Sequence, residues 1–100
     1  MTYRVRYTLE AAERLRKFHP EIKREIRQGI RELLISPLSG HPLQLELSGY
    51  RSYRIRTYRI VYQINDGEST LDVIYVGPRR TVYEELKAML LVRGRKNVEL

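Results

Sequence analysis

The sequence predicts a single α+β domain in which helices pack on a mostly antiparallel four-stranded sheet. The chain has 100 residues, of which 42% are hydrophobic. This composition is enough for one compact core, and the chain is too short for two domains. Apolar residues recur with helical spacing in the first third of the chain, and from Tyr50 onward they alternate. The predicted order is strand, two helices, three strands and a final helix, which is typical of α+β proteins.

The first third of the chain predicts one short strand and two helices. Alternation over residues 3–7 indicates a strand with one apolar side. Thr8 is a typical N-cap for a helix whose apolar face is formed by Leu9, Ala12, Leu15 and Phe18. Pro20 ends that helix and opens the next, because the residue before a proline disfavours helical dihedrals and proline suits a first turn. The second helix ends at Ser36-Pro37, and its apolar stripe consists of Ile22, Ile26, Ile30, Leu33 and Leu34.

The second half of the chain predicts three strands and a last helix. Alternation over residues 50–56 and 58–64 indicates two strands that form a hairpin. The mostly apolar stretch 71–76 indicates a third strand, apolar on both faces and therefore central, which ends at the Gly-Pro step 77–78. Residues 81–92 predict a helix whose inward side chains are Val82, Leu86, Met89 and Leu90.

Composition excludes several kinds of site. The chain contains no cysteine, so it has no disulfide scaffold, no thiolate nucleophile and no cysteine-based zinc site. Its histidines, His19 and His41, are far apart and adjacent to prolines, so we expect no metal and no cofactor, and we interpret His41 as an incidental loop residue. The longest apolar run, residues 88–92, is too short to cross a bilayer, and the N-terminus lacks the pattern of a secretory signal. We therefore expect a cytoplasmic protein without membrane contact.

The charge of the chain points to a phosphate-bearing partner. Lys and Arg number 19 against 12 Asp and Glu, which gives a net charge of +7. Fifteen of the cations are Arg and only four are Lys. Arginine makes planar, two-pronged contacts with phosphate, whereas lysine acts as a point charge. This balance is typical of nucleic-acid binding, although a basic protein without such a partner fits the same composition.

The predicted hairpin concentrates positive charge. Residues 47–65 contain no acid and four arginines: Arg51, Arg54, Arg56 and Arg59. If Arg56-Thr57 form a tight two-residue turn, Arg54 faces Arg59 directly across the hairpin. Like charges opposed in a sheet are destabilising, and an anion bound between them would offset that repulsion. Arg-Thr is an unfavourable pair for such a turn, which prefers residues that tolerate positive φ.

Two further residues extend this surface. Arg79, at the end of the last strand, is expected to join Arg56 on the face that carries the opposed arginines. Tyr83 follows four residues later, at the start of the last helix, where its hydroxyl can turn toward that face. The alternative is an exposed set of unrelated arginines, with Tyr83 packed beside Val82 and Leu86.

Three stretches carry recognisable motifs: LSG over residues 47–49, YRIRTYRIVY over residues 53–62, and VGPRRTVY over residues 76–83. Together with the two helices they resemble the RelE-type toxins of toxin–antitoxin systems, in the RelE/ParE superfamily. The family pattern is a leucine-glycine step, a hairpin reading YR(V/L)GDYR(I/V)(V/I)Y and a closing VGHRxxVY. The resemblance implies one RelE-like domain over residues 1–92, followed by a basic C-terminal tail over residues 93–100.

The resemblance implies an mRNA endonuclease of the mRNA interferase type, often acting in the ribosomal A site and inhibiting translation without metal. Such enzymes use the RNA's own 2′-hydroxyl as nucleophile. By position, Arg59 would stabilise charge on the scissile phosphate, and Arg79 would bind the phosphate or assist the leaving group. Tyr83 would handle the 2′-hydroxyl proton or stack on a base. Arg54 and Arg56 stand where family members often carry Lys or Arg for the RNA backbone and for proton transfer. The expected RNA-binding residues are Arg56, Arg51 and Arg80.

Two departures from the family pattern affect the chemistry. Arg56-Thr57 replaces the usual Gly-Asp turn, and Pro78 replaces a frequent His or Lys. Because arginine is always protonated, Tyr83 is the one matched side chain that titrates in a usable range. The lack of carboxylates in the hairpin argues against a two-metal nuclease. We expect a slow ribonuclease whose substrate or ribosome supplies much of the alignment.

Two other functions fit the same fold or charge. A ParE-like inhibitor would bind DNA gyrase and leave RNA intact, and a non-catalytic basic module would bind RNA or only an antitoxin. Arg59, Arg79 and Tyr83 together favour the ribonuclease, because gyrase inhibitors of this fold generally lack that set. As a toxin, the chain is also expected to have a cognate antitoxin protein with an acidic amphipathic segment.

Overall fold

The structure, a computed structural model, describes the backbone of residues 2–99 and the side chains of residues 2–92. Along the chain its helices and strands are β1 (Arg4–Tyr7), α1 (Leu9–Lys17), α2 (Pro20–Ile35), β2 (His41–Pro42), β3 (Arg51–Ile55), β4 (Tyr58–Asn65), β5 (Thr70–Pro78) and α3 (Val82–Glu99). This is the α+β arrangement that the sequence predicts, with one strand more.

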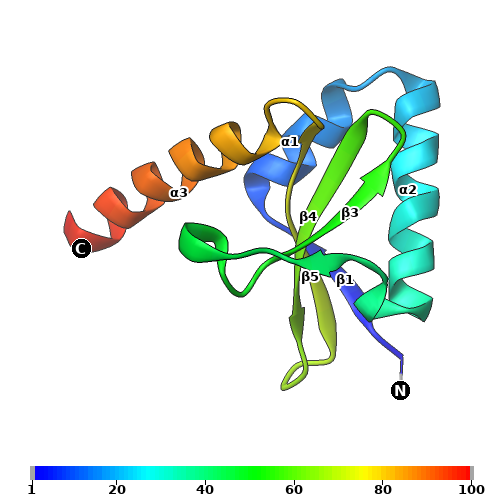
Figure 1. Cartoon of the computed structure of the whole chain (residues 1–100), viewed down its shortest axis with the longest axis horizontal. Coiled ribbons are helices and arrows are strands. Elements are labelled where there is room, and N and C mark those ends of the chain that lie inside the picture. The colour runs from blue at the N-terminus through cyan, green and yellow to red at the C-terminus, as the bar shows by residue number, and fades with distance from the viewer. Residues whose placement is uncertain (1, 100) are drawn as a thin grey trace.

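A mixed sheet of five strands runs through the centre in the order β1-β5-β4-β3-β2 (Figure 1). β1 pairs with β5 in parallel, and the other neighbours are antiparallel. The sequence predicts four strands, and the additional one is β2, which has two residues and is too short to show an alternating pattern. β5 lies between β1 and β4, as predicted for a strand that is apolar on both faces.

Helices cover both faces of the sheet. α1 and α2 pack on one face, around a core that includes Ile26, Leu33 and Tyr62. α3 packs on the opposite face, around Val61 and Leu86, and Figure 1 shows α2 and α3 on opposite sides of the sheet. Within the described residues, no helix is both long and apolar enough to span a membrane. Because side chains alternate along a strand, successive residues of β3, or of β4, point to opposite faces of the sheet, one covered by α1 and α2 and the other by α3.

The start of α1 confirms the predicted cap and corrects the predicted face. The Thr8 hydroxyl accepts a hydrogen bond from the Ala11 N–H at 3.1 Å. Leu9 is 70% exposed and Ala12 is exposed, whereas Ala11 is fully buried. The Thr8 hydroxyl also donates to the Ile74 carbonyl at 2.7 Å, and this tie to β5 sets the rotation of the helix on the sheet.

Two elements extend beyond the residues predicted for them, 71–76 and 81–92. β5 continues through Gly77 and Pro78, because these residues still pair with Arg59 and Tyr58 of β4. α3 runs past its predicted end and includes residues 93–99, which contain no proline to stop it. The side chains of the predicted basic tail lie outside the described residues.

Buried polar contacts hold the segment between α2 and β3. The Tyr62 hydroxyl donates to the Pro37 carbonyl at 2.6 Å and accepts from the Gly40 N–H at 3.1 Å. The Arg51 guanidinium donates to the Gly40 carbonyl at 2.7 Å. Gly40 has no room for a side chain, since a Cβ there would lie 2.6 Å from the Tyr62 hydroxyl and 2.7 Å from the Ser52 carbonyl oxygen. β2 is therefore fixed against β3.

Candidate functional site

Two of the predicted catalytic residues, Arg59 and Tyr83, meet at one buried hydroxyl. Arg59 Nη1 donates to Ser52 Oγ at 3.2 Å, and the Tyr83 hydroxyl donates to the same oxygen at 3.0 Å. Ser52 is fully buried, while Arg59 and Tyr83 are half-buried. These contacts join β3, β4 and the first turn of α3. A cation and a phenol thus converge on the sheet face that α3 covers.

Arg54 lies beside this pair. It sits directly opposite Arg59 in the antiparallel register, as the two-residue turn at Arg56-Thr57 predicts. Arg56 has a φ of 54°, the left-handed conformation that such a turn requires and that non-glycine residues rarely adopt. Arg54 Nε donates to the Arg56 carbonyl at 2.9 Å, which restrains its exposed guanidinium beside the turn.

Arg79 and Arg80 follow β5 at the same end of the sheet. The Arg79 N–H donates to the Thr57 carbonyl at 2.6 Å, so its backbone lies against the hairpin turn. Both arginines are exposed, and with the neighbouring turn residues they line a depression of about 510 Å³. Ligand sites commonly measure about 300–1,000 Å³. By register, four arginines stand at this end of the sheet, which we call the arginine end: Arg54, Arg59, Arg79 and Arg80. The depression itself is lined by Arg79 and Arg80 and by neither Arg54 nor Arg59.

Glu85 anchors the first turn of α3, which carries Tyr83. Its carboxylate accepts hydrogen bonds from Arg14 at 2.9 Å, from the Thr81 hydroxyl at 3.0 Å and from the Tyr75 hydroxyl at 3.2 Å. Burial raises the pKa of Tyr75, while the adjacent Arg14 opposes that rise. Glu85 therefore holds the first turn of α3 in place. Its ion pair with Arg14 offsets the negative charge of the Glu85 carboxylate near the arginine end.

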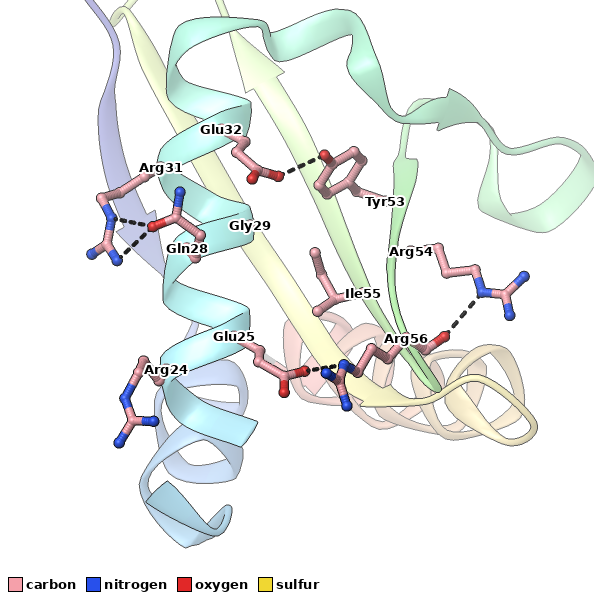
Figure 2. A pocket seen from close by; sticks show the side chains of 10 residues that line it. All are labelled: Arg24, Glu25, Gln28, Gly29, Arg31, Glu32, Tyr53, Arg54, Ile55 and Arg56. Atoms are coloured by element: carbon pink, nitrogen blue, oxygen red, sulfur yellow. Dashed lines mark hydrogen bonds and ion pairs between the residues drawn. The ribbon is translucent and has the colours of Figure 1, made fainter. Parts of the chain in front are cut away.

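Two predicted RNA-contact residues lie away from the arginine end. Arg51 is directed at the segment before β2, where it donates to the Gly40 carbonyl. Arg56 forms an ion pair with Glu25 of α2 at 3.2 Å, and its side chain is 78% exposed. Figure 2 shows Arg56 reaching toward α2 while Arg54 projects away from it. Arg56 was expected on the sheet face that carries Arg54 and Arg59, and it does not lie there. The side-chain alternation of β3 stops before Arg56, because Arg56 belongs to the turn.

The groove between α2 and β3 in Figure 2 is lined in part by Arg54, but not by Ser52 or its two hydrogen-bond donors. It has a volume of about 610 Å³. Across it, the Tyr53 hydroxyl donates to Glu32 at 2.8 Å, and this bond raises the pKa of Tyr53. Gly29 lets α2 approach β3 closely, since a Cβ there would lie 2.5 Å from the Ile55 side chain.

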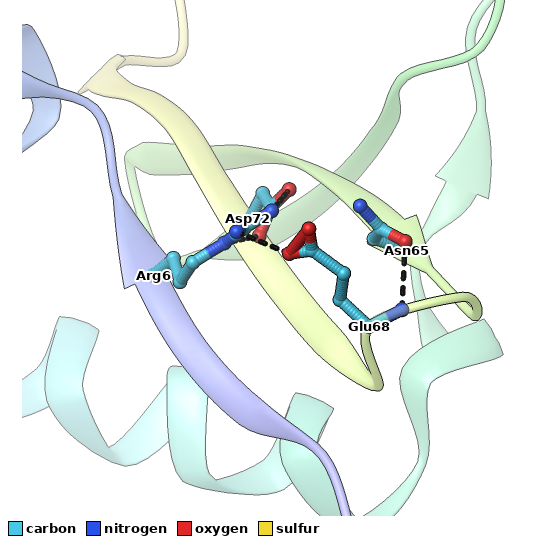
Figure 3. Close-up of polar contacts among 4 residues, drawn as sticks. All are labelled: Arg6, Asn65, Glu68 and Asp72. Atoms are coloured by element: carbon cyan, nitrogen blue, oxygen red, sulfur yellow. Dashed lines mark hydrogen bonds and ion pairs between the residues drawn. The ribbon is translucent and has the colours of Figure 1, made fainter.

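Acidic side chains gather toward the other end of β5. Arg6 of β1 binds Asp72 at 2.9 Å and Glu68 at 2.6 Å (Figure 3). The hydrogen bond from Arg6 holds the pKa of Asp72 below its usual value. Asp72 pairs with Gln63, whereas Arg59 lies nearer the hairpin turn, so the acidic group and the arginine end are separated along β4. No group of three or more His, Asp or Glu residues in the described part of the chain is arranged to hold a metal ion.

Sequence reasoning missed two features around this site. Ser52 carries no motif signal, and its position becomes informative only once its two hydrogen-bond donors are known. His41, interpreted as an incidental loop residue, belongs to β2 and pairs directly with Ser52. The sequence Gly40-His41-Pro42 predicts a loop, because glycine and proline, which flank His41, are common in turns.

Known proteins with similar sequences are toxins. Residues 5–83 match the family model described as ParE toxin of type II toxin-antitoxin system, parDE. The chain is 36% identical to Toxin RelG of Mycobacterium tuberculosis, over 83% of this chain and 98% of that protein. It is 33% identical to Toxin RelE of the same organism, over 81% of this chain and 86% of that protein.

Solved toxin structures share the fold. A chain in the toxin–antitoxin complex RelBE2 of M. tuberculosis superposes with a TM-score of 0.73 and 36% identity, over 79% of this chain and 100% of that chain. A free mutant of E. coli toxin RelE gives a TM-score of 0.75 at 24% identity, over 93% and 98% of the two chains, and supports the fold alone. The resemblance found in the motifs is confirmed by the match over residues 5–83 and by the identity to RelG. The chain belongs to the RelE/ParE family of toxins from type II toxin–antitoxin systems.

Proposed function

We propose that this toxin is a metal-independent endoribonuclease that cuts mRNA through the RNA's own 2′-hydroxyl and thereby inhibits translation. The observation that carries the proposal is the meeting of Arg59 and Tyr83 at Ser52, with Arg54 directly opposite Arg59. A phosphodiester laid over Ser52 would contact two restrained cations and a phenol. These are groups suited to phosphoryl transfer.

Fixed cations suit the charge that develops during this reaction. Attack of the 2′-hydroxyl on phosphorus leaves more negative charge on the phosphate oxygens than the intact diester carries. Cations that are already in place therefore bind the transition state more tightly than the RNA, which accelerates the step. Arg59 fits this role best, because Ser52 holds its guanidinium and the sheet holds its backbone. Arg54 supplies a second positive charge from the opposite strand.

The other arginines extend the contact with RNA. Arg79 and Arg80 lie exposed beside the turn, where they can bind the phosphate or the leaving group and a flanking phosphate. Arg56 can exchange its exposed ion pair with Glu25 for an RNA phosphate, since exposed pairs are worth little. Arg51 receives a structural role in this proposal, because its guanidinium holds the segment before β2.

The openness of the site favours ribosome-bound mRNA as substrate. Arg54, Arg79 and Arg80 are exposed and Arg59 is only half-buried, so the protein alone restrains a flexible RNA strand only in part. A ribosome holds mRNA in a fixed path and would supply the missing orientation, which also implies action in the cytoplasm. The net charge of +7 favours docking on ribosomal RNA as well.

A cognate antitoxin is the expected protein partner. Solved structures with this fold include toxin–antitoxin complexes from M. tuberculosis, E. coli and Pyrococcus horikoshii. A chain with a net charge of +7 should bind an antitoxin through an acidic amphipathic segment that lies over the helices or the arginine end. Co-expression of that antitoxin should restore growth that the toxin alone arrests.

Incubation with translating ribosomes tests the ribonuclease. Site-specific cuts in mRNA are expected from the wild type and from Arg31→Ala, a variant on the solvent face of α2. Arg59→Ala should lose the cuts by a factor of about 10² to 10³, as for removal of one fixed donor to a transition-state oxyanion. Intact mRNA with all three proteins would contradict the proposal.

Gyrase inhibition is the second candidate, because the matching family model is named for ParE toxins. In a parallel reaction with DNA gyrase and supercoiled plasmid, the ribonuclease proposal predicts no effect of the toxin. Inhibited gyrase together with intact mRNA would establish the second candidate.

A further inference from the structure

His41 lies on the same sheet face as the contacts of Arg59 and Tyr83 with Ser52. Residues directly opposite in an antiparallel pair project to the same side, with Cβ atoms about 4.5–5.5 Å apart, and His41 is opposite Ser52. Alternation along the segment gives the same result. Gly40 faces Tyr62 in the core beneath α2, and Leu43 packs in the core beneath α3. His41, between them, shares the side of Leu43.

The backbone around His41 is rigidly held for so short a strand. Tyr62 ties down the Pro37 carbonyl and the Gly40 N–H, and Arg51 binds the Gly40 carbonyl. On the other side, the Leu43 N–H donates to the Tyr50 carbonyl at 2.9 Å. These contacts fix the backbone that carries the exposed His41 opposite the buried Ser52, which an incidental loop residue does not require.

The proposed reaction still needs a group that removes the 2′-hydroxyl proton. Arginine is always protonated and has no lone pair to accept a proton. A phenol ordinarily keeps its proton at neutral pH, which suits Tyr83 as a donor. Imidazole is the side chain that accepts protons most readily in this pH range, and His41 brings one to this face of the sheet.

We propose that His41 is the general base of the reaction and takes the 2′-hydroxyl proton of an RNA whose phosphate is bound by Arg59 and Arg54. This inference rests on the ribonuclease function proposed above. As the imidazole nitrogen gains the proton, the O2′–P bond forms and the P–O5′ bond breaks. The 5′-oxygen leaves with the bonding electron pair and takes the Tyr83 hydroxyl proton. The products are a 2′,3′-cyclic phosphate and a 5′-hydroxyl, and exchange of protons with water restores both side chains.

Two matched substrates distinguish the loss of the general base from the loss of the general acid. One is a ribosome-bound mRNA with the normal 5′-oxygen at the cut site, and the other carries sulfur at that bridging position. A sulfur leaving group needs no proton, so it should rescue a variant that lacks the acid and leave a variant without the base slow. The variants are His41→Ala and Tyr83→Phe, with His19→Asn as the histidine control because it keeps a capping side chain at the start of α2.

We expect His41→Ala to cleave both substrates about 10² to 10⁴ times more slowly than wild type, the usual contribution of a general base. Added imidazole should restore part of that rate, and binding of a 2′-deoxy analogue should stay unchanged, which a folding defect would not allow. Tyr83→Phe should be slow on the oxygen substrate alone, and His19→Asn should match wild type.

Wild-type rates from His41→Ala, or its rescue by the sulfur substrate, would overturn the assignment while leaving the ribonuclease intact. A wild-type protein that leaves both substrates uncut would instead refute the proposed function, and the role of His41 with it.

Discussion

Arg54 of β3 and Arg59 of β4 lie directly opposite each other, yet their guanidinium groups have different partners. Arg54 donates to the Arg56 carbonyl at 2.9 Å, and Arg59 donates to Ser52 at 3.2 Å. Neither contact neutralises the two charges. Opposed like charges destabilise a sheet, so an anion that binds both should stabilise the folded protein.

Inorganic phosphate should therefore raise the melting temperature of the wild type more than chloride does at the same ionic strength. The rise should be smaller for Arg54→Gln, because one of the two binding charges is lost. Arg31→Gln, on the solvent face of α2, should behave as the wild type. Thermal unfolding of the three proteins measures this, and equal shifts in all of them would show that phosphate binds elsewhere.

Removal of the Ser52 hydroxyl should loosen the site without abolishing the fold. Ser52→Ala leaves Arg59 and Tyr83 without their shared acceptor, so we expect mRNA cleavage to fall by about 10-fold to 100-fold, mainly in kcat. The free energy of unfolding should fall by about 1–3 kcal/mol, because two half-buried donors lose their partner. Kinetics and urea denaturation give the two values, with the exposed Ser39→Ala as control. A kcat equal to that of the wild type would refute the positioning role of Ser52.

The sequence predicted those elements whose determinants are local. The apolar stripe of α2 follows from side-chain spacing within one helix, and Ile26, Ile30 and Leu33 are buried as predicted. The register that opposes Arg54 to Arg59 follows from the two residues between alternating halves of one hairpin. The rotation of α1 could not be predicted, because it depends on a contact between Thr8 and Ile74, 66 residues apart.

The candidate site divides in the same way. Arg59 and Tyr83 stand in motifs, and the structure brings them together. The contact between Ser52 and Tyr83 depends on where the first turn of α3 packs against β3, and the direction of Arg56 depends on Glu25 of a distant helix. Neither contact can be predicted from the spacing of residues near each other in the sequence.

Gly40→Ala should be strongly destabilising. The added methyl group would lie 2.6 Å from the Tyr62 hydroxyl and 2.7 Å from the Ser52 backbone oxygen, and the backbone cannot yield as a side chain can. Overpacking of this kind costs about 1–3 kcal/mol, and the shift of β2 should also slow mRNA cleavage. Gly67→Ala is the matched control, because its Cβ would meet Asn65 at an ordinary 3.5 Å. Similar unfolding midpoints for the two variants in urea would show that the segment accommodates the methyl group.

Acid should remove the stabilisation that Asp72 provides. Its hydrogen bond from Arg6 lowers its pKa in the folded protein, so its contribution is full above the ordinary aspartate value of 3.8 and is lost as the pH falls through the lowered value. Asp72→Asn should therefore be less stable than wild type near neutral pH, and the difference should shrink below pH 3.8. Urea midpoints across this range test the sign. A difference that stays constant on acidification would mean that the ionised carboxylate contributes nothing.

The end groups of cut mRNA test the central claim most directly. Mass spectrometry of fragments made by the toxin on translating ribosomes should find 2′,3′-cyclic phosphate on the upstream fragment and a 5′-hydroxyl on the downstream one, with both reduced by a factor of about 10² to 10³ for Arg59→Ala. Uncut mRNA, or fragments that end in a 3′-hydroxyl and a 5′-phosphate, would contradict the account.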